Sequence, residues 1–315
     1  MPETTLDPDK LLAELHDLWG DLARGHSEPL LRACAMTLLI VCDDGEDILA
    51  VRRIAGALMR DHPSRTILLQ TLSGAPPRAH VFSECRDLSD GRRQIYSEGI
   101  VVTADPATLS DVAPALRALG APDLPVMLWY RGPAVFVSRA LDSLLPLAQK
   151  VMVDSGTALD PQGAIVLLTQ WRRQGIHVAD LAWTRLTGWR EALAHAFDAG
   201  PSERARIGSM KIRVAGASGT GVWYLKRWME RAAPATQVAL ETVSGERGVR
   251  GIALSCGPSE LSIDLADDGF LEIRAGAQRW RSPFPETTEI ALLSEELSIG
   301  GIDQVFEDLL EHAEG

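Results

Sequence analysis

Residues 33–42 read ACAMTLLIVC, a nearly unbroken apolar run that is followed directly by the acidic turn DDGED at residues 43–47. A strand that is apolar on both faces is typical of a parallel sheet covered on both sides. Residues 46–60 then carry apolar side chains at helical spacing, and residues 65–72 return to a strand pattern after Pro63. This order of strand, helix and strand predicts an α/β domain.

The same alternation continues through the first two thirds of the chain. An amphipathic helix is expected at residues 11–22, and a polar turn between two strand patterns predicts an antiparallel hairpin at residues 79–103. Further helices are expected at residues 106–119, 139–147, 161–173 and 181–197, and strands at 124–130 and 150–153. We therefore expect an α/β N-terminal domain with a mixed, mostly parallel sheet and flanking helices.

The pattern of predicted helices and strands changes near residues 198–206 (DAGPSERAR), which predicts a boundary between domains 1–203 and 204–315. A strand at 207–214 and a helix at 222–232 precede five short strand patterns about ten residues apart, separated by turn signals such as SGERG and ADDG. These patterns, at 238–243, 251–256, 261–265, 270–273 and 278–281, predict an antiparallel meander. The second domain is thus expected to be α+β, ending in helices within residues 292–312.

Composition excludes several classes of function. The net charge is −12 and no run of Lys and Arg exists, so a nucleic-acid partner is not expected. No window approaches the apolar length of a membrane span, and residues 1–10 resemble no secretion signal, which favours a cytoplasmic protein. The four Cys and seven His show no metal-ligand spacing. We expect no catalytic residues, metal or cofactor.

A glycine-rich turn at residues 214–228 (VAGASGTGVWYLKRW) is a first candidate site. Gly216, Gly219 and Gly221 join a strand to a helix, where backbone N–H groups can hold an anion. Their spacing matches neither a dinucleotide fingerprint nor a phosphate-binding loop with Lys-Ser/Thr, and the unit is expected to enter an antiparallel region. The turn is interpreted as structural, with an anion site or a nucleotide site as alternatives.

Residues 61–65 (DHPSR) form a second candidate. His62, Ser64 and Arg65 could together hold a carboxylate or phosphate, with the forked guanidinium of Arg65 as the main donor. In the alternative interpretation, His62 complements a helix C-terminus, while Ser64 and Arg65 satisfy free carbonyl and carboxylate groups.

The third candidate is DLAWTRLTGWR at residues 180–190. Asp180 can cap a helix, and Trp183, Arg185, Trp189 and Arg190 are of the types enriched at binding hot spots. These side chains would then anchor a protein partner. The alternative is that both Trp residues are core anchors with Arg guanidinium groups stacked over them.

Taken in order, several segments resemble the OpcA family of glucose-6-phosphate dehydrogenase assembly proteins. They are HPSR (62–65), SEGIVV (97–102), DLPVMLWYRG (123–132), DLAWTRLTGWR (180–190), the glycine turn ending in LKRWM, and LLSEELSIGGIDQVFEDLL (292–310). The family shows a Trp-Trp pair where this chain has Trp129 and Tyr130, which implies an altered contact if that pair binds the partner.

The resemblance implies a non-catalytic protein that binds glucose-6-phosphate dehydrogenase, promotes its active oligomer and supports NADPH supply by the oxidative pentose phosphate pathway. The acidic C-terminus, with nine carboxylates from Glu286 onward and no Lys or Arg, would steer a basic patch of the partner. The alternative hypothesis is an enzyme that binds sugar phosphate or NADP through the turn from Gly216 to Gly221.

Overall fold

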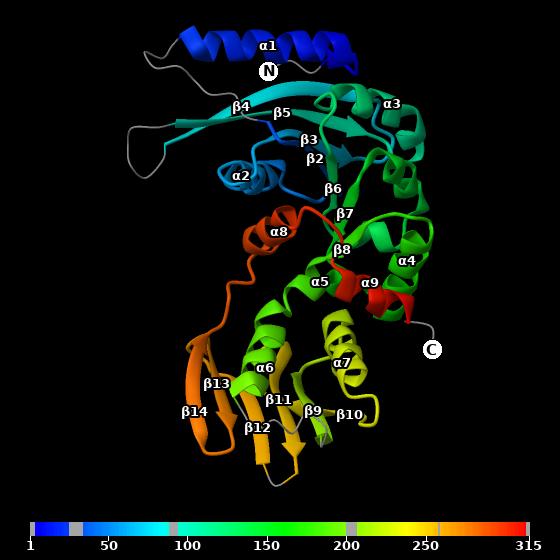
Figure 1. Ribbon diagram of the computed structural model, residues 1–315. Helices are drawn as coiled ribbons and strands as arrows, with labels where there is room; N and C mark the ends of the chain where they lie inside the picture. The colour runs from blue at the N-terminus through cyan, green and yellow to red at the C-terminus, as the bar shows by residue number, and fades with distance from the viewer. Residues whose placement is uncertain (1–3, 25–33, 88–93, 200–206, 258, 313–315) are drawn as a thin grey trace.

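The computed structural model describes residues 4–24, 34–87, 94–199, 207–257 and 259–312. Its first sheet has eight strands in the order β1-β4-β5-β3-β2-β6-β7-β8 (Figure 1). Six adjacent strands are parallel: β5 (Gln94–Ala104), β3 (Ser64–Thr71), β2 (Met36–Cys42), β6 (Val126–Tyr130), β7 (Lys150–Val153) and β8 (Val178–Asp180). Numbered along the chain from β2, they stand in the order 3-2-1-4-5-6 of the Rossmann fold. The expectation of a mostly parallel sheet is confirmed.

The hairpin predicted on the edge of the parallel strands is also present. β4 (Arg78–Asp87) pairs antiparallel with β5, and β1 (Thr4–Thr5) pairs antiparallel with β4. The turn predicted between the two hairpin strands lies outside the described residues.

Strand β2 is buried at all seven of its positions, as its nearly unbroken apolar sequence predicts. Side chains alternate between the two faces of the sheet. One face packs against α2 (Ile48–Leu58) and α8 (Glu289–Ser298), with Leu38, Ile40, Trp129 and Met152 in the contact. The other face lies under α1 (Pro8–Arg24), α3 (Leu109–Leu119) and α4 (Pro161–Arg173), with Leu39, Val41, Leu128 and Val151 in the contact.

Two predicted helices differ in form. Residues Arg139–Leu147 form a 3-10 helix, η3, which contains Pro146, a residue with no N–H to donate. The helix expected at 181–197 is divided into α5 (Leu181–Thr184) and α6 (Thr187–Ala199). At the division, the N–H of Leu186 donates to the carbonyl of Trp183, so the chain tightens there before α6 begins. Shorter 3-10 turns are η1 (Pro106–Thr108), η2 (Pro133–Phe136) and η4 (Ser155–Thr157).

The second sheet has six strands in the order β10-β9-β11-β12-β13-β14. Their bounds are β9 (Ile207–Ala215), β10 (Val238–Val243), β11 (Gly248–Cys256), β12 (Ser259–Leu265), β13 (Phe270–Ala275) and β14 (Gln278–Pro283). The meander from β11 to β14 is antiparallel, as predicted, but the expectation that residues 238–243 belong to it is wrong. β10 pairs parallel with β9, because α7 (Thr220–Ala232) crosses over and returns the chain to the same end of the sheet.

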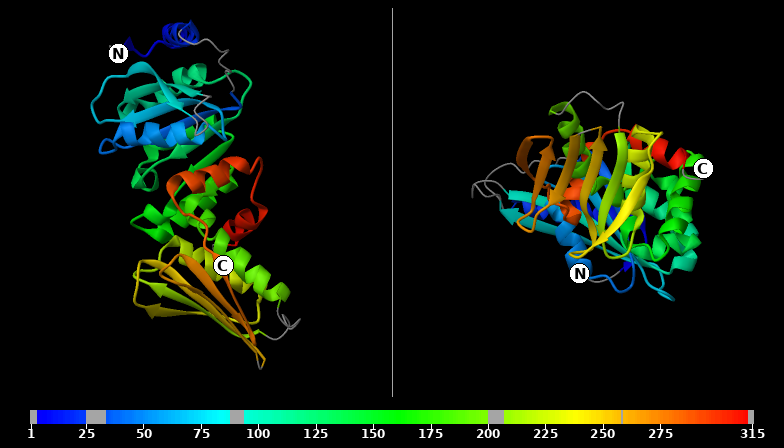
Figure 2. Two further views of the ribbon diagram at one scale, coloured as in Figure 1. Left: turned by 90° about the vertical axis from the view of Figure 1, so that its left-hand side faces the viewer. Right: turned by 90° about the horizontal axis from the view of Figure 1, so that it is seen from below.

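The chain then runs back from the second sheet to the first. α8 packs against α2 and α5, and α9 (Gln304–Glu311) packs against α4 and α7. Figures 1 and 2 show α8 and α9 between the two sheets, with α1 at one end of the molecule and the second sheet at the other. The predicted boundary at residues 203 and 204 lies outside the described residues. Among the described helices, none has the length and apolar character needed to cross a membrane.

Candidate functional site

The carboxyl ends of β2 and β6 mark the point where the strand order reverses, which is where open α/β sheets bind their ligands. A dinucleotide would place its pyrophosphate on the N–H groups at the start of α2. Here the chain leaves β2 through Asp43, Asp44, Gly45 and Glu46, and Asp47 caps α2 by accepting from the N–H of Leu49 at 2.9 Å. These carboxylates stand where a phosphate would have to bind, and like charges repel.

Arg131, which follows β6, forms ion pairs with segments on both sides of this point. Its guanidinium pairs with Glu46, and its Nε lies 3.0 Å from Oε1 of Glu289 on the first turn of α8. The next residue, Gly132, has a φ of 89°, and a Cβ there would stand 3.2 Å from Oδ2 of Asp43. Burial raises the pKa of Asp43, against a hydrogen bond from the backbone of Ala134 that lowers it. The crevice is therefore crossed by ion pairs from three segments of the chain.

Helix α8 meets two of the residues that the sequence singled out. Nε2 of His62 lies 3.0 Å from Oγ of Ser294, and Trp129 is buried in the core beneath the same helix. The remaining residues of the HPSR motif point elsewhere. Ser64 is buried against the sulfur of Met59. The side chains of His62, Ser64 and Arg65 have separate partners, so they are not arranged to hold one anion together.

Arg65 has the structural role named as the alternative. Its Nη1 donates to the carbonyl oxygens of Leu119 and Gly120 at 3.2 and 3.1 Å, which satisfies the C-terminal end of α3. A guanidinium at this end of a helix also complements the helix dipole.

Asp180 is the centre of a buried network between the two sheets. The carboxylate is fully buried and accepts from the N–H groups of Ser155 and Ala182 at 3.0 and 2.9 Å. It also accepts from the hydroxyls of Ser155 and Tyr224. Oγ of Ser155 lies 2.7 Å from Oγ1 of Thr220, the first residue of α7. One carboxylate thus joins η4, β8 and α5 to α7.

The buried carboxyl of Asp180 predicts a specific pH dependence. Burial raises the pKa of Asp180 from 3.8 to about 6, against the lowering effect of its hydrogen bonds from Ser155 and Tyr224. Because the folded-state pKa is the higher one, the stability that this group contributes is complete below about pH 4 and is lost as the pH rises through about 6.

We expect the stability advantage of wild type over Asp180→Asn, measured by urea denaturation, to fall by roughly 2–3 kcal/mol between about pH 4 and about pH 7.5. A difference that stays constant over this range would contradict the raised pKa. The variant should be less stable than wild type over the whole pH range. Its amide N–H₂ would face hydroxyl or N–H groups that donate to a carboxylate oxygen in the wild type.

The two Trp side chains that follow Asp180 lie inward. Trp183 is buried, stacks on Phe306 at a ring separation of 5.8 Å, and donates from Nε1 to Oδ2 of Asp303 at 2.7 Å. The guanidinium of Arg190 lies 3.8 Å from the centre of the Trp183 ring. This is the alternative arrangement, a core anchor with Arg over its face, and burial excludes direct contact of Trp183 with a partner in this conformation.

The other residues of the motif are likewise engaged within the chain. Trp189 is buried against Phe284, at a ring separation of 5.5 Å. Nη2 of Arg185 pairs with Oδ2 of Asp154 at 2.8 Å. The expected surface anchor is therefore replaced by a set of contacts that fix α5 and α6 in the molecule.

The acidic C-terminal segment is also engaged within the molecule. Seven of its nine carboxylates have partners: Glu289 with Arg131, Glu295 with Thr187, Glu296 with Lys150 and Thr184, Asp303 with Trp183, Glu307 and Glu311 with Arg172, and Asp308 with Arg231. These contacts bind α8 and α9 to the body of the protein. The sequence suggested that these carboxylates would steer a basic partner. In the structure seven of them are instead engaged by groups of the same chain.

The glycine turn lies at the start of α7, where it contacts α5. Gly216 has a φ of 75°, which suits glycine, and is exposed. Gly219 is the N-cap of α7, and a Cβ on Gly221 would stand 3.5 Å from the carbonyl oxygen of Ala182. Since Thr220 is fully buried between these glycines, the helix terminus is docked against protein. This geometry favours the structural interpretation of the turn.

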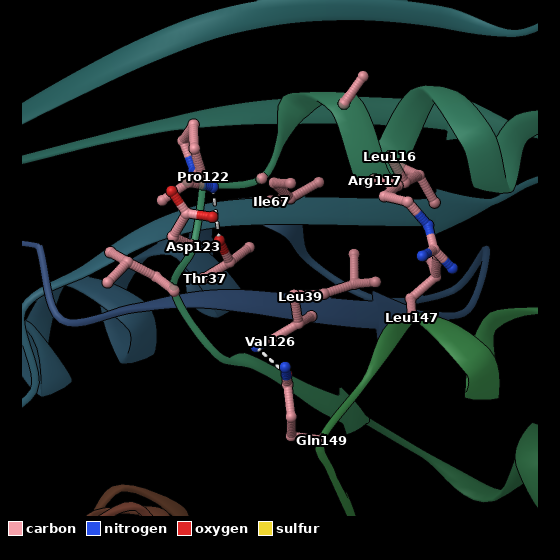
Figure 3. Close-up of a pocket in the computed structure, with 14 residues that line it drawn as sticks. Thr37, Leu39, Ile67, Leu116, Arg117, Pro122, Asp123, Val126, Leu147 and Gln149 are labelled. Carbon is pink, nitrogen blue, oxygen red and sulfur yellow. Dashed lines mark hydrogen bonds between the residues drawn. The ribbon is translucent and has the colours of Figure 1, made fainter.

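A pocket of about 420 Å³ lies at the opposite, amino edge of the parallel strands (Figure 3). Leu39, Ile67, Leu116 and Leu147 line it, with Arg117, Asp123 and Gln149 at its polar positions. Oγ1 of Thr37 accepts from the N–H of Ala121 at 2.8 Å, and Gln149 accepts from the N–H of Val126. None of the candidate site residues predicted from the sequence lines this pocket, although Asp123, Leu124 and Val126 belong to the DLPVMLWYRG segment.

The strand order defines a Rossmann-like fold followed by a second, largely antiparallel sheet, with carboxylates where the phosphate-binding glycines of a dinucleotide site would be. The chain belongs to the OpcA family. Two family models match it, both of a glucose-6-phosphate dehydrogenase subunit. The model of the N-terminal domain matches residues 55–170, and the model of the C-terminal domain matches residues 176–310.

Curated relatives bear the family name. The OxPP cycle protein OpcA of Nostoc punctiforme is 28% identical over 158 residues, which are 49% of this chain and 34% of that protein. The Synechocystis protein of the same name is 28% identical over 116 residues, 37% of this chain and 24% of that protein. The chain thus matches about a third or less of the length of these two relatives.

Solved structures share the fold at low identity. The 3-ketoreductase KijD10 of Actinomadura kijaniata, solved with NADP and TDP-benzene, is 12% identical with a TM-score of 0.50, covering 88% of this chain and 94% of that one. Biliverdin reductase of Synechocystis is 9% identical with a TM-score of 0.48, covering 87% and 95%. At this identity the likeness to the ketoreductase concerns the fold alone.

Proposed function

We propose that this chain is a non-catalytic partner of glucose-6-phosphate dehydrogenase, which binds the enzyme and promotes its active oligomer. In this role it supports NADPH supply by the oxidative pentose phosphate pathway. The observation that carries the proposal is the acidic, ion-paired switch point: Asp43, Glu46 and the pairs of Arg131 lie at the strand-to-helix turn where dinucleotide-binding proteins of this fold bind phosphate. The family is described as a glucose-6-phosphate dehydrogenase subunit, and this description is the reason for naming that enzyme as the partner.

The proposal predicts activation of the dehydrogenase from the same organism. Adding the purified protein should raise kcat/KM, measured as NADPH formation, by about 5-fold or more, the lower part of the range for coupled binding sites. The two proteins should co-elute in size-exclusion chromatography as a species larger than either alone. Heat-denatured protein is the control. Separate elution together with unchanged kinetics would contradict the proposal.

An enzyme that binds NADP or sugar phosphate through Gly216 to Gly221 is the competing candidate, and ligand binding separates the two. Any ligand that prefers the folded state raises its Tm by mass action. Under our proposal neither NADP nor glucose 6-phosphate shifts the Tm of the isolated protein. A shift that is abolished by Gly219→Val would favour the competing enzyme.

A further inference from the structure

The carboxyl rim of the parallel sheet carries a group of exposed aliphatic side chains. Leu159 is 91% exposed, Val137 76% and Leu49 58%, and Ile290 is also exposed. Each lies on a segment at the carboxyl ends of the parallel strands: Leu49 on the first turn of α2, Val137 and Leu159 after β6 and β7, and Ile290 on the first turn of α8. We call these four residues the rim cluster.

Contacts between neighbouring elements bring the four segments together. Arg131 joins the residues just before α2 to the first turn of α8 through Glu46 and Glu289. α2 and α8 pack on each other, and the turns η2 and η4, which precede Val137 and Leu159, are also in contact. Single exposed aliphatic residues are ordinary on a protein surface, but a group of them in one region indicates an interaction site.

The rim cluster is held in ordered backbone. The N–H of Val137 donates to the carbonyl of Ala134 at 3.0 Å, and the N–H of Ala158 donates to the carbonyl of Ser155 at 3.1 Å. Directly after Leu159, Asp160 caps α4. Side chains presented by fixed turns lose little conformational freedom when a partner covers them.

The charge around the rim cluster is acidic. Asp44, Asp47, Asp160 and Glu286 are exposed. Three arginines of these segments are paired: Arg131 with Glu46 and Glu289, Arg139 with Asp142, and Arg185 with Asp154. Arg53 of α2 is exposed, so the excess of carboxylates here is partial. The surface that complements this rim is therefore one with apolar side chains surrounded by Lys and Arg.

We propose that the rim cluster is the surface on which this protein docks a basic, partly apolar face of glucose-6-phosphate dehydrogenase. This rests on the proposed function, which names the enzyme as the partner. The same edge of the sheet that would hold a dinucleotide in an oxidoreductase holds a protein here. The acidic charge that would repel phosphate attracts the partner's cations.

The test is binding of the dehydrogenase to Val137→Asp/Leu159→Asp, measured by biolayer interferometry beside wild type. We expect Kd to rise about tenfold or more, because interface centres tolerate buried charge poorly. Leu240→Asp, at an aliphatic residue of β10 that is 46% exposed, is the matched control and should bind like wild type. Asp44→Lys should slow association, and the difference should shrink at high salt.

Each outcome has one meaning. If wild type binds and the double variant binds equally well, the rim cluster is not the docking surface, while the proposed function stands. If wild type itself does not bind, the proposed function fails. If the double variant has the same Tm as wild type but alters self-association of the free protein instead of dehydrogenase binding, the rim is a contact between copies of this chain, and the inference is overturned.

Discussion

Replacing Trp183 with alanine should lower the free energy of unfolding by about 3–5 kcal/mol, the usual loss for a large aromatic residue in a core. Trp183 is 1% exposed. Its ring stacks on Phe306 of α9 and meets the ring of Tyr224 of α7 edge to face at 6.2 Å. Its indole N–H is bonded to Asp303. The substitution would leave a cavity and also remove a hydrogen bond from the cap residue of α9.

Urea denaturation followed by far-ultraviolet circular dichroism measures this loss. Trp280→Ala on β14 is the matched control: it removes the same side chain from a half-buried position, and we expect a clearly smaller loss. Equal losses for the two variants, or a loss at Trp183 below about 1 kcal/mol, would show that Trp183 is not the anchor that the packing indicates.

Replacing Lys150 with methionine should cost about 3–5 kcal/mol, because it leaves a carboxylate buried without its cation. Nζ of Lys150 lies 2.8 Å from Oε2 of Glu296 and 2.7 Å from its carbonyl oxygen, and both residues are buried. Oε1 of Glu296 accepts from Oγ1 of Thr184 at 2.6 Å. This pair binds α8 to the start of β7.

The double variant Lys150→Met/Glu296→Leu separates charge from packing. A buried ion pair can often be replaced by apolar residues of similar size at little cost, since the desolvation of two charges disappears with them. We therefore expect the double variant to recover at least half of the loss seen in Lys150→Met. A double variant as unstable as the sum of the two single variants would mean that the pair does not act as a unit.

The order of strands and helices could be read from the chain because it depends on local patterns. The nearly unbroken apolar run that ends at Cys42 indicated a strand buried on both faces, and the polar turn that begins at Asp87 indicated a hairpin rather than a crossover. Which strands pair with each other was harder to predict from the sequence. Residues 238–243 have the length and turns of a meander strand, yet β10 lies parallel to β9 because α7 carries the chain back across the sheet.

The candidate site was only partly predictable. Asp180 was recognised as a cap and does accept from the N–H of Ala182, a contact two residues away. Its partners Ser155 and Tyr224 carry no signal in the sequence, because they come from separate turns and helices that meet only after folding. The rim cluster was missed for the same reason. Four aliphatic residues spread from Leu49 to Ile290 look like ordinary core positions until their exposure is known.

By itself, the sequence determined a two-sheet protein of the OpcA family, since periodicity, caps and motif order are properties of neighbouring residues. Only the tertiary structure decided which charges are free. The carboxylates of α8 and α9 suggest an acidic tail in the sequence, but long-range ion pairs with Arg131, Lys150, Arg172 and Arg231 attach most of them to the rest of the molecule. The tertiary structure likewise placed Trp183 and Trp189, expected at a surface, in the core, with Arg190 over the Trp183 ring. Charge and burial depend on groups distant in the chain, so no local pattern could assign them.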